Sequence, residues 1–186
     1  MSSSVLFIGD GFTADGNWSD WLPEYDVRNL GANGHTTDEV VAELDQVVDR
    51  QPDAVVVAVG TNDLGWHRSD EYVVRNMETV LCMLRKRLPA VRILVVSVPP
   101  RESELADTVR SINRHLRQFA PTLHAQYLDL WTRLARPDGE IDVAYSDDRL
   151  HLNDAAYAVW VSELKPALEI LFQRPPSSSA IPIQQI

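Results

Sequence analysis

The chain has 186 residues, of which 45% are apolar and 24% charged, the composition of an ordinary globule with one hydrophobic core. Its formal net charge is −10 and only two lysines accompany the fifteen arginines, which excludes a basic stripe for binding a nucleic-acid backbone. The sequence contains no apolar run of about 18 residues and no signal-peptide pattern, so we expect no membrane span and a cytoplasmic location.

The first predicted element is a buried strand, because four apolar residues, Val5–Ile8, run directly into Gly9-Asp10-Gly11. Ligands of open α/β sheets bind where such strands end, so Asp10 and Gly11 are candidate site residues. Residues 17–22 then predict one or two helical turns, and residues 26–29 predict a short second strand.

A loop that contains two glycines, residues 31–37, follows the second strand. Thr36 and Glu39 have the spacing of a capping box, and apolar residues at helical spacing continue from there to Val48. The valine-rich run at residues 54–59 predicts a third strand that is buried on both faces, as in a parallel sheet.

Ser69 predicts the start of a long helix that Pro89 stops. The single cysteine, Cys82, lies within this helical pattern, has no partner for an intramolecular disulfide, and is interpreted as a small core thiol. Residues 93–98 predict the fourth strand, and a helix that buries apolar residues from Leu105 to Phe119 comes next.

The fifth strand is predicted at residues 126–128 and is followed by a less regular segment, residues 130–143. A polar loop at residues 145–153 precedes the last helix, which is expected over residues 154–172 with a kink at Pro166. Strands that alternate with helices predict right-handed crossovers and a parallel sheet with helices on both faces. The loops after the first three strands and the loop before the last helix should then open at one edge of the sheet.

Four of these loop residues supply the parts of an acyl-transfer site. Asp148 and His151 lie three residues apart, a spacing at which the carboxylate holds one nitrogen of the imidazole and leaves the other for a reacting atom. Asn62 and Gly34 are candidate hydrogen-bond donors to an oxyanion. Each residue also has a structural interpretation, as a solvated loop pair or a turn residue, so none is decisive alone.

In order and placement, the loops resemble the sequence blocks of the SGNH hydrolases, also called the GDSL family. Gly11 stands where the first block of that family carries its nucleophilic serine. The resemblance spans residues 5–172 of the chain. The segments that match the four blocks are residues 9–13, 29–37, 60–63 and 148–151.

The resemblance implies a three-layer, flavodoxin-like α/β sandwich around a five-stranded parallel sheet. Length and composition predict one domain over residues 1–173, followed by a flexible tail rich in proline and serine over residues 174–186. The resemblance also implies a serine-type ester hydrolase that acts on small-molecule acyl esters without a cofactor. The five histidines show no metal-ligand spacing, so no metal site is expected.

By the same resemblance, His151 is the general base and Asp148 orients it. The backbone N–H of Gly11, the N–H of Gly34 and the amide of Asn62 form the oxyanion hole. Further candidates for lining the substrate pocket are Asp10, Asn33, His35, Trp66 and His67.

Glycine at position 11 has no hydroxyl, so the chain as written is expected to be inactive or very slow. We interpret it as an esterase inactivated by a single Ser-to-Gly change. A natural pseudoenzyme, an acyl-binding module without catalysis, and slow hydrolysis by a water that His151 activates are alternatives. Thr13 is disfavoured as a substitute nucleophile, because its hydroxyl should point away from the site.

A different class of function comes from the same turn. Residues 9–14 also fit the dinucleotide fingerprint G-x-G-x-x-A after a strand. Asp10 would then lie beside a phosphate, and the second strand ends at Asn29 and not at an acidic residue, so this interpretation is disfavoured. The sequence leaves open the acyl and alcohol groups, hydrolysis or transfer, and the oligomeric state.

Overall fold

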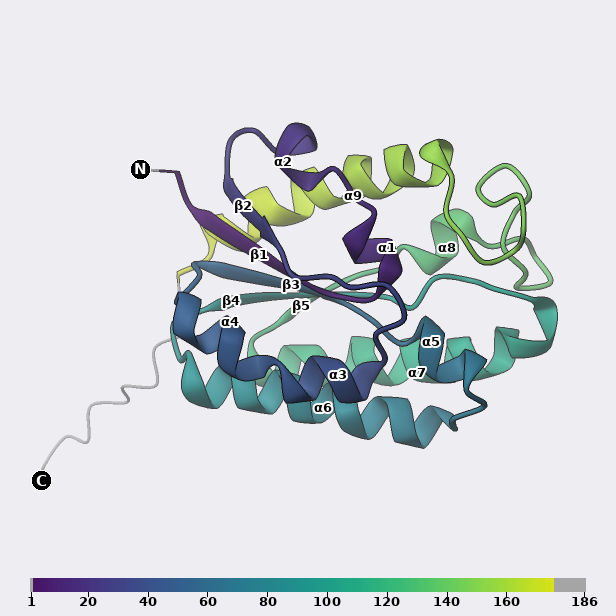
Figure 1. Cartoon of the computed structure of the whole chain (residues 1–186), viewed down its shortest axis with the longest axis horizontal. Helices are drawn as coiled ribbons and strands as arrows, with labels where there is room; N and C mark the ends of the chain where they lie inside the picture. Colours follow the sequence, from purple (N-terminus) through teal and green to yellow (C-terminus); the bar gives the residue numbers. More distant parts are fainter. Residues whose placement is uncertain (1, 176–186) are drawn as a thin grey trace, which may run out of the picture.

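A computed structural model describes residues 2–175 and shows a parallel sheet between two helical layers (Figure 1). The strands stand in the spatial order β2-β1-β3-β4-β5, and every neighbouring pair is parallel. This is the order of the flavodoxin-like sandwich, so the predicted fold is confirmed. The strands are β1 (Ser4–Gly9), β2 (Asp26–Asn29), β3 (Ala54–Ala58), β4 (Arg92–Val96) and β5 (Gln126–Leu128).

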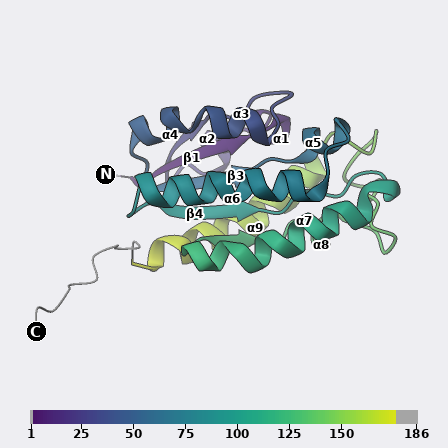
Figure 2. The same cartoon turned by 90° about the horizontal axis from the view of Figure 1, so that it is seen from below.

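Helices cover both faces of the sheet (Figure 1). Those on the lower face in Figure 1 are α3 (Thr37–Ala42), α4 (Leu44–Arg50), α6 (Asp70–Arg87) and α7 (Ala106–Phe119). Those on the upper face are α1 (Gly11–Ala14), α2 (Trp18–Trp21), α8 (Trp131–Leu134) and α9 (Asp154–Gln173). The remaining short helices are α5 (Thr61–Gly65), η1 (Ser103–Leu105) and η2 (Ala120–Leu123). Figure 2 shows α6 and α7 packed side by side across the lower face.

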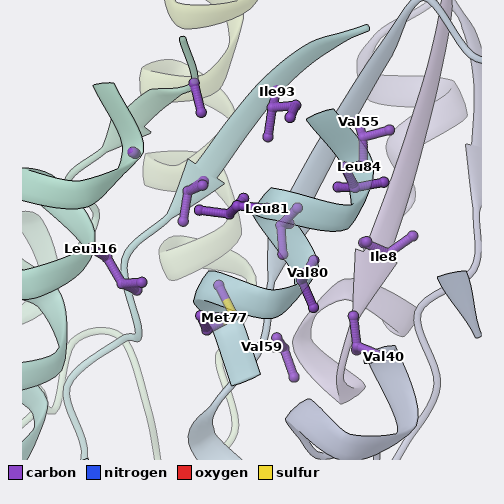
Figure 3. Close-up of a cluster of buried hydrophobic side chains, with 14 of the residues drawn as sticks. Ile8, Val40, Val55, Val59, Met77, Val80, Leu81, Leu84, Ile93 and Leu116 are labelled. Atoms are coloured by element: carbon purple, nitrogen blue, oxygen red, sulfur yellow. The ribbon is translucent and has the colours of Figure 1, made fainter. Parts of the chain in front are cut away.

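The three central strands, β1, β3 and β4, are buried on both faces, because their alternating side chains enter two separate cores. Leu6 and Ile8 of β1 point into the core beneath α6, which Figure 3 shows, while Val5 and Phe7 point into the core beneath α9. The second core contains a cluster of aromatic rings in which Trp18 stacks on Phe7 at 4.5 Å between centroids. Both helical layers are therefore tied to the same central strands.

The predicted capping box is present at the start of α3. The Thr36 hydroxyl accepts from the N–H of Asp38, and the Glu39 carboxylate accepts from the N–H of Thr36 at 2.7 Å. The single helix expected after it is wrong in extent, because the chain leaves helical geometry at Glu43 and divides into α3 and α4. The apolar spacing survives the break, so both pieces still face the sheet.

The prediction that Cys82 is a core thiol is wrong, because its side chain is exposed. Helix α6 buries residues three and four apart, and position 82 lies about 100° around the helix from the buried Leu81, on the outer side. Ser69 caps this helix as expected, by accepting from the N–H of Tyr72.

In the C-terminal third, the last helix runs through Pro166 over the expected range, as α9. The segment expected to be less regular contains one short helix, α8. Most of the expected tail, residues 176–186, lies outside the described residues. None of the helices within residues 2–175 is both long and apolar enough to cross a bilayer.

Candidate active site

The candidate residues lie at the carboxyl edge of the sheet, where β1, β2 and β3 end. Gly11 begins α1, Gly34 lies in the loop after β2, and Asn62 lies in the first turn of α5. The loop that carries His151 reaches the same end of the molecule, at the right in Figure 1. The edge predicted from the alternation of strands and helices is therefore the edge at which the chain gathers these residues.

At the turn after β1, the backbone of Gly9 lies close to the backbone of Ala58 on β3. Gly9 has φ +156°, and a Cβ there would lie 1.9 Å from the carbonyl oxygen of Ala58 on β3. Only glycine fits this position, because any side chain would collide with the neighbouring strand. The turn points the chain into α1, whose N-cap is Asp10.

Asp10 joins the starts of α1 and α5. Its buried carboxylate accepts from the N–H of Phe12 at 3.1 Å and is also hydrogen-bonded by the backbone of Gly60 and Thr61. Burial raises the pKa of Asp10 to about 7, against the opposing effect of these hydrogen bonds. Asp10 therefore positions backbone around the site and does not face a substrate.

The space beside Gly11 is occupied by the side chain of Asn33. An ideal Cβ at position 11 would lie 2.6 Å from Asn33 Oδ1 and 3.6 Å from its Cγ. The backbone of Gly11 has no positive φ, so a residue with a side chain can adopt it. Asn33 is exposed, and its amide is the movable end of a side chain. A serine at position 11 thus requires a rotation of Asn33 and no change of fold.

Three candidate donors lie on the loops at this edge of the sheet. Within residues 2–175, no acceptor bonds to the N–H of Gly11 or the N–H of Gly34. The Asn62 amide donates one hydrogen to the carbonyl of His35 at 2.8 Å, which fixes its orientation and leaves its second hydrogen free. Gly34 has φ +81°, a backbone conformation that favours glycine. A Cβ there would meet nothing within 4 Å, so the backbone conformation and not a lack of space calls for glycine.

A buried carboxylate that the sequence analysis did not single out holds the loop after β2 to α5. Asp63 accepts from the N–H of Thr37 at 2.9 Å and from its hydroxyl at 2.7 Å, and it pairs with Arg68 at 3.1 Å. Asp63 follows Asn62, so the same contacts fix the position of Asn62 relative to the loop after β2. The only sequence feature that points to Asp63 is its position in the third sequence block, residues 60–63.

Asp148 and His151 form the predicted pair. The Asp148 Oδ2 atom lies 2.5 Å from His151 Nδ1, and Oδ1 accepts from the N–H groups of Leu150 and His151. The hydrogen bonds from His151 hold the pKa of Asp148 well below its usual range, so it is a carboxylate. Arg149, with φ +66°, folds the loop back to allow these contacts. A carboxylate at Nδ1 leaves the Nε2 atom as the acceptor.

The loop of this pair is connected to α1 through α9. The hydroxyl of Tyr157 donates to the carbonyl of Phe12 at 2.8 Å, in a buried contact between α9 and α1. The hydroxyl of Thr13, in the same helix, donates to the carbonyl of Ala58 and is fully buried. Thr13 therefore points away from the open edge, as expected.

Arg101, which was not predicted as a site residue, binds the first residue of α5. Its Nη1 donates to the carbonyl of Thr61 at 2.7 Å, and the residue is buried. Its own carbonyl accepts from the N–H of Ile141, in the segment that leads to the Asp148 loop. No spacing in the sequence signals this role.

The remaining predicted pocket residues lie at the rim. The Trp66 side chain is 73% exposed, and within the described chain neither it nor His67 makes a side-chain hydrogen bond. His35 Nδ1 is buried and lies 3.7 Å from Glu43 Oε2, too far for a hydrogen bond. The loop after β2 contacts Gly11 through the side chain of Asn33 and binds the Asn62 amide through the carbonyl of His35. The placement of Trp66 and His67 in a substrate pocket stays a prediction.

The site offers acyl-transfer chemistry more readily than cofactor binding. Helix α1 has only four residues, too short to give a pyrophosphate the long helix of a dinucleotide site. No group of three or more histidine, cysteine or acidic side chains in the part of the chain with assigned structure is arranged to hold a metal ion. What the edge contains is an imidazole with its carboxylate and a set of free N–H donors.

Comparison with known proteins agrees with this chemistry. Residues 7–159 match the model of the GDSL-like lipase/acylhydrolase family. The chain is 28% identical over 179 residues to subunit alpha2 of platelet-activating factor acetylhydrolase IB from Rattus norvegicus and from Homo sapiens. Each alignment covers 91% of this chain and 76% of the relative.

Solved structures share the fold at lower identity. A GDSL-like lipase from Bacteroides thetaiotaomicron superposes with a TM-score of 0.77 at 19% identity, over 90% of this chain and 88% of its own. A carbohydrate esterase family 3 protein from Talaromyces cellulolyticus gives a TM-score of 0.73 at 16% identity, over 92% and 99%. These likenesses show the fold, and the family model shows the family to which the chain belongs.

Proposed function

Because the chain belongs to the GDSL-like lipase/acylhydrolase family, we propose that its site is built to hydrolyse small acyl esters through a serine at position 11. Gly11 leaves the present chain with the base and the oxyanion donors but without the attacking hydroxyl. The observation that supports this most is the 2.5 Å contact between Asp148 and His151. It fixes the imidazole, and the Nε2 atom of His151 has no hydrogen-bond partner among the described residues.

The proposed roles follow from the geometry at the edge. With serine at position 11, His151 Nε2 takes the proton of the serine hydroxyl as its oxygen attacks the ester carbonyl, and later gives it to the leaving alcohol. The N–H groups at positions 11 and 34 and the amide of Asn62 stabilise the oxyanion of the tetrahedral intermediate. Water then releases the acyl group by the reverse sequence of steps.

Glycine retains its N–H but not the nucleophile. Loss of a catalytic serine costs roughly a millionfold in turnover, with about a thousandfold over water left from binding and the oxyanion hole. The protein as written therefore binds acyl esters far better than it cleaves them. A single Ser-to-Gly change in an otherwise complete esterase accounts for the retained Asp148–His151 pair.

A non-catalytic acyl-binding protein, or a natural pseudoenzyme, is the second candidate. The position of Asn33 supports it, because the asparagine amide takes the space that a side chain at position 11 would need. In this case the site would have adapted to glycine, and a serine placed there would be held away from the base.

The test is the Gly11→Ser variant with Gly11→Ala as its matched control. Both changes require the same movement of Asn33, but only serine adds a nucleophile. We expect Gly11→Ser to hydrolyse aryl acetates and to be labelled by a phosphonate probe at position 11, and Gly11→Ala to do neither. The named relatives are acetylhydrolases, so acetyl esters are assayed first.

Adding His151→Ala to the serine variant should abolish both turnover and labelling. If Gly11→Ser neither turns over nor labels, the esterase assignment fails. Saturable binding of an uncleaved acetyl ester by that variant would then support the acyl-binding alternative.

A further inference from the structure

A groove runs along the free edge of the sheet, at β5, and shares no residue with the candidate active site. Its volume is about 840 Å³, and it lies between the C-terminal halves of α7 and α9, which Figure 2 shows at the same side of the molecule. We call it the edge groove. Its defining residues are Arg92, Arg117, His124, Gln126, Ile170 and Arg174.

The edge groove concentrates positive charge in an acidic protein. Eight of the fifteen arginines pair with a carboxylate within 4.0 Å. Arg92, Arg117 and Arg174 have no such partner among residues 2–175, nor has Arg114 in a smaller adjoining hollow of about 240 Å³. One carboxylate, Asp129, lines both hollows and accepts from the N–H of Thr132. Several arginines thus face a single acidic side chain there.

Two donors at this groove are shielded from solvent and unused. Arg92 Nε and Gln126 Nε2 are buried atoms with no hydrogen-bond partner in the described chain. Buried donors in proteins are almost always satisfied, by protein, water or ligand. Arg92 is also held in place, because its guanidinium lies 5.1 Å from the centre of the Phe172 ring. Because both residues line the groove, these two donors are candidates for binding an acceptor there.

The other walls are apolar. Val91, Ala125 and Leu171 are buried side chains at the groove, and Ile170 on α9 is 48% exposed. An amphiphile with an anionic head and an apolar tail requires two environments. Unpaired guanidinium groups would bind its head, and the apolar walls beside them would shield its tail from water.

We propose that the edge groove is a binding site for an amphiphilic oxyanion, an alkyl chain that carries a carboxylate or phosphate head. The head is held by Arg92, Arg117 and the Gln126 amide, and the chain lies against Ile170 and Leu171. This site is independent of ester hydrolysis and of the residue at position 11.

The experiment measures binding of octanoate and of octyl phosphate by titration calorimetry, with octanol and inorganic phosphate as the two halves of the ligand. We expect one saturable site for at least one amphiphilic anion, and binding at least about tenfold weaker for octanol and for phosphate alone. Which of the two anions binds more tightly tells whether the head is a carboxylate or a phosphate.

Variants separate this site from the rest of the surface. Arg117→Gln, an exposed position, should weaken binding about tenfold or more, and Arg92→Gln should do the same. The matched control is Arg75→Gln, since Arg75 is exposed on α6 and has no carboxylate partner among residues 2–175. It should bind like the unchanged protein.

His151→Ala separates the groove from the candidate active site and should leave binding unchanged. The proposal is overturned if neither anion binds at millimolar concentration, or if Arg117→Gln binds as tightly as the unchanged protein. Loss of binding in His151→Ala, with Arg117→Gln unaffected, would also overturn it, because the ligand would then occupy the acyl site.

Discussion

At the scale of single residues, the carboxylate of Asp148 does two things for the imidazole beside it. Its Oδ2 atom lies 2.5 Å from His151 Nδ1, and its Oδ1 atom shapes the loop by accepting from two backbone N–H groups. An amide in its place would keep the size but place a donor against Nδ1, which favours the wrong tautomer of His151.

We therefore expect Asp148→Asn, made in the Gly11→Ser protein, to lower turnover by about ten-thousandfold with little change in KM. The steady-state kinetics of an aryl acetate provide the measurement. The neighbouring Asp147→Asn is the control, because Asp147 is exposed and makes no side-chain hydrogen bond within residues 2–175. Equal turnover in the two variants would contradict the proposed role.

Asp10 gives the pH dependence of stability a defined sign. Burial raises its pKa in the folded protein from 3.8 to about 7, so between these values the folded chain holds a proton that the unfolded chain has released. The stability that the protonated Asp10 contributes to the folded protein is fully present below about pH 4 and is lost as the pH rises to about 7. The difference between the two pKa values corresponds to about 4 kcal/mol at most.

In Asp10→Asn this pH dependence should disappear. The measurement is urea unfolding at several pH values between 4 and 8, with the difference in the free energy of unfolding between the unchanged and variant proteins plotted against pH. We expect the unchanged protein to lose stability relative to the variant as the pH rises through that range. A difference that does not vary with pH would mean that Asp10 is ionised throughout.

The sequence predicted residue roles only where a motif carries them. Asp148, His151 and Asn62 were found from spacing and order, and their proposed roles await the variants above. Asn33 occupies the space beside Gly11 through its side-chain rotamer, which no sequence pattern encodes. Cys82 was misplaced because a helical pattern shows that a residue is in a helix, while its distance around the axis from the apolar stripe decides burial.

At the scale of elements, the junction between α1 and α9 connects the helix that begins at Gly11 to the helix that follows the loop of His151. The carbonyl of Phe12 receives the Tyr157 hydroxyl at 2.8 Å, and the contact is buried. The two residues are 145 positions apart, so no local pattern could have indicated the contact. Strands and long helices were predictable because periodicity marks them locally, whereas α8 is one turn and too short to show a period.

Tyr157→Phe should lower the free energy of unfolding by about 1–3 kcal/mol, because it leaves a buried carbonyl without its donor. Chemical denaturation measures the change. Tyr72→Phe is the comparison, since the Tyr72 hydroxyl bonds to Asp38 at an exposed position and its loss should change stability by less than about 0.5 kcal/mol. Equal losses of stability in the two variants would show that the buried contact between α1 and α9 contributes no more than an exposed hydrogen bond.

At the scale of the whole molecule, the sheet is the shared wall of two cores. Its parallel strands between two helical layers follow from a rule that a sequence can use, the alternation of strands with helices, whereas its strand order was expected only from the family resemblance. The same order puts the ends of β1, β2 and β3 at one edge and leaves β5 free at the side. The candidate active site was predictable from this topology, but the edge groove depends on which arginines find partners, which only the folded chain shows.

The lower core should therefore be separable from the chemistry at the edge. Leu84 is fully buried beneath the sheet (Figure 3), and Leu84→Ala should cost about 2–5 kcal/mol, as large-to-small changes in cores do. Val143→Ala, at a side chain that is 70% exposed, should change stability by less than about 0.5 kcal/mol. In the Gly11→Ser protein, Leu84→Ala should lower the midpoint of unfolding while turnover per folded molecule stays the same. A matching loss of turnover under fully folding conditions would mean that the lower core also holds the donors of the site in place, through α3 and the Asp63 contacts.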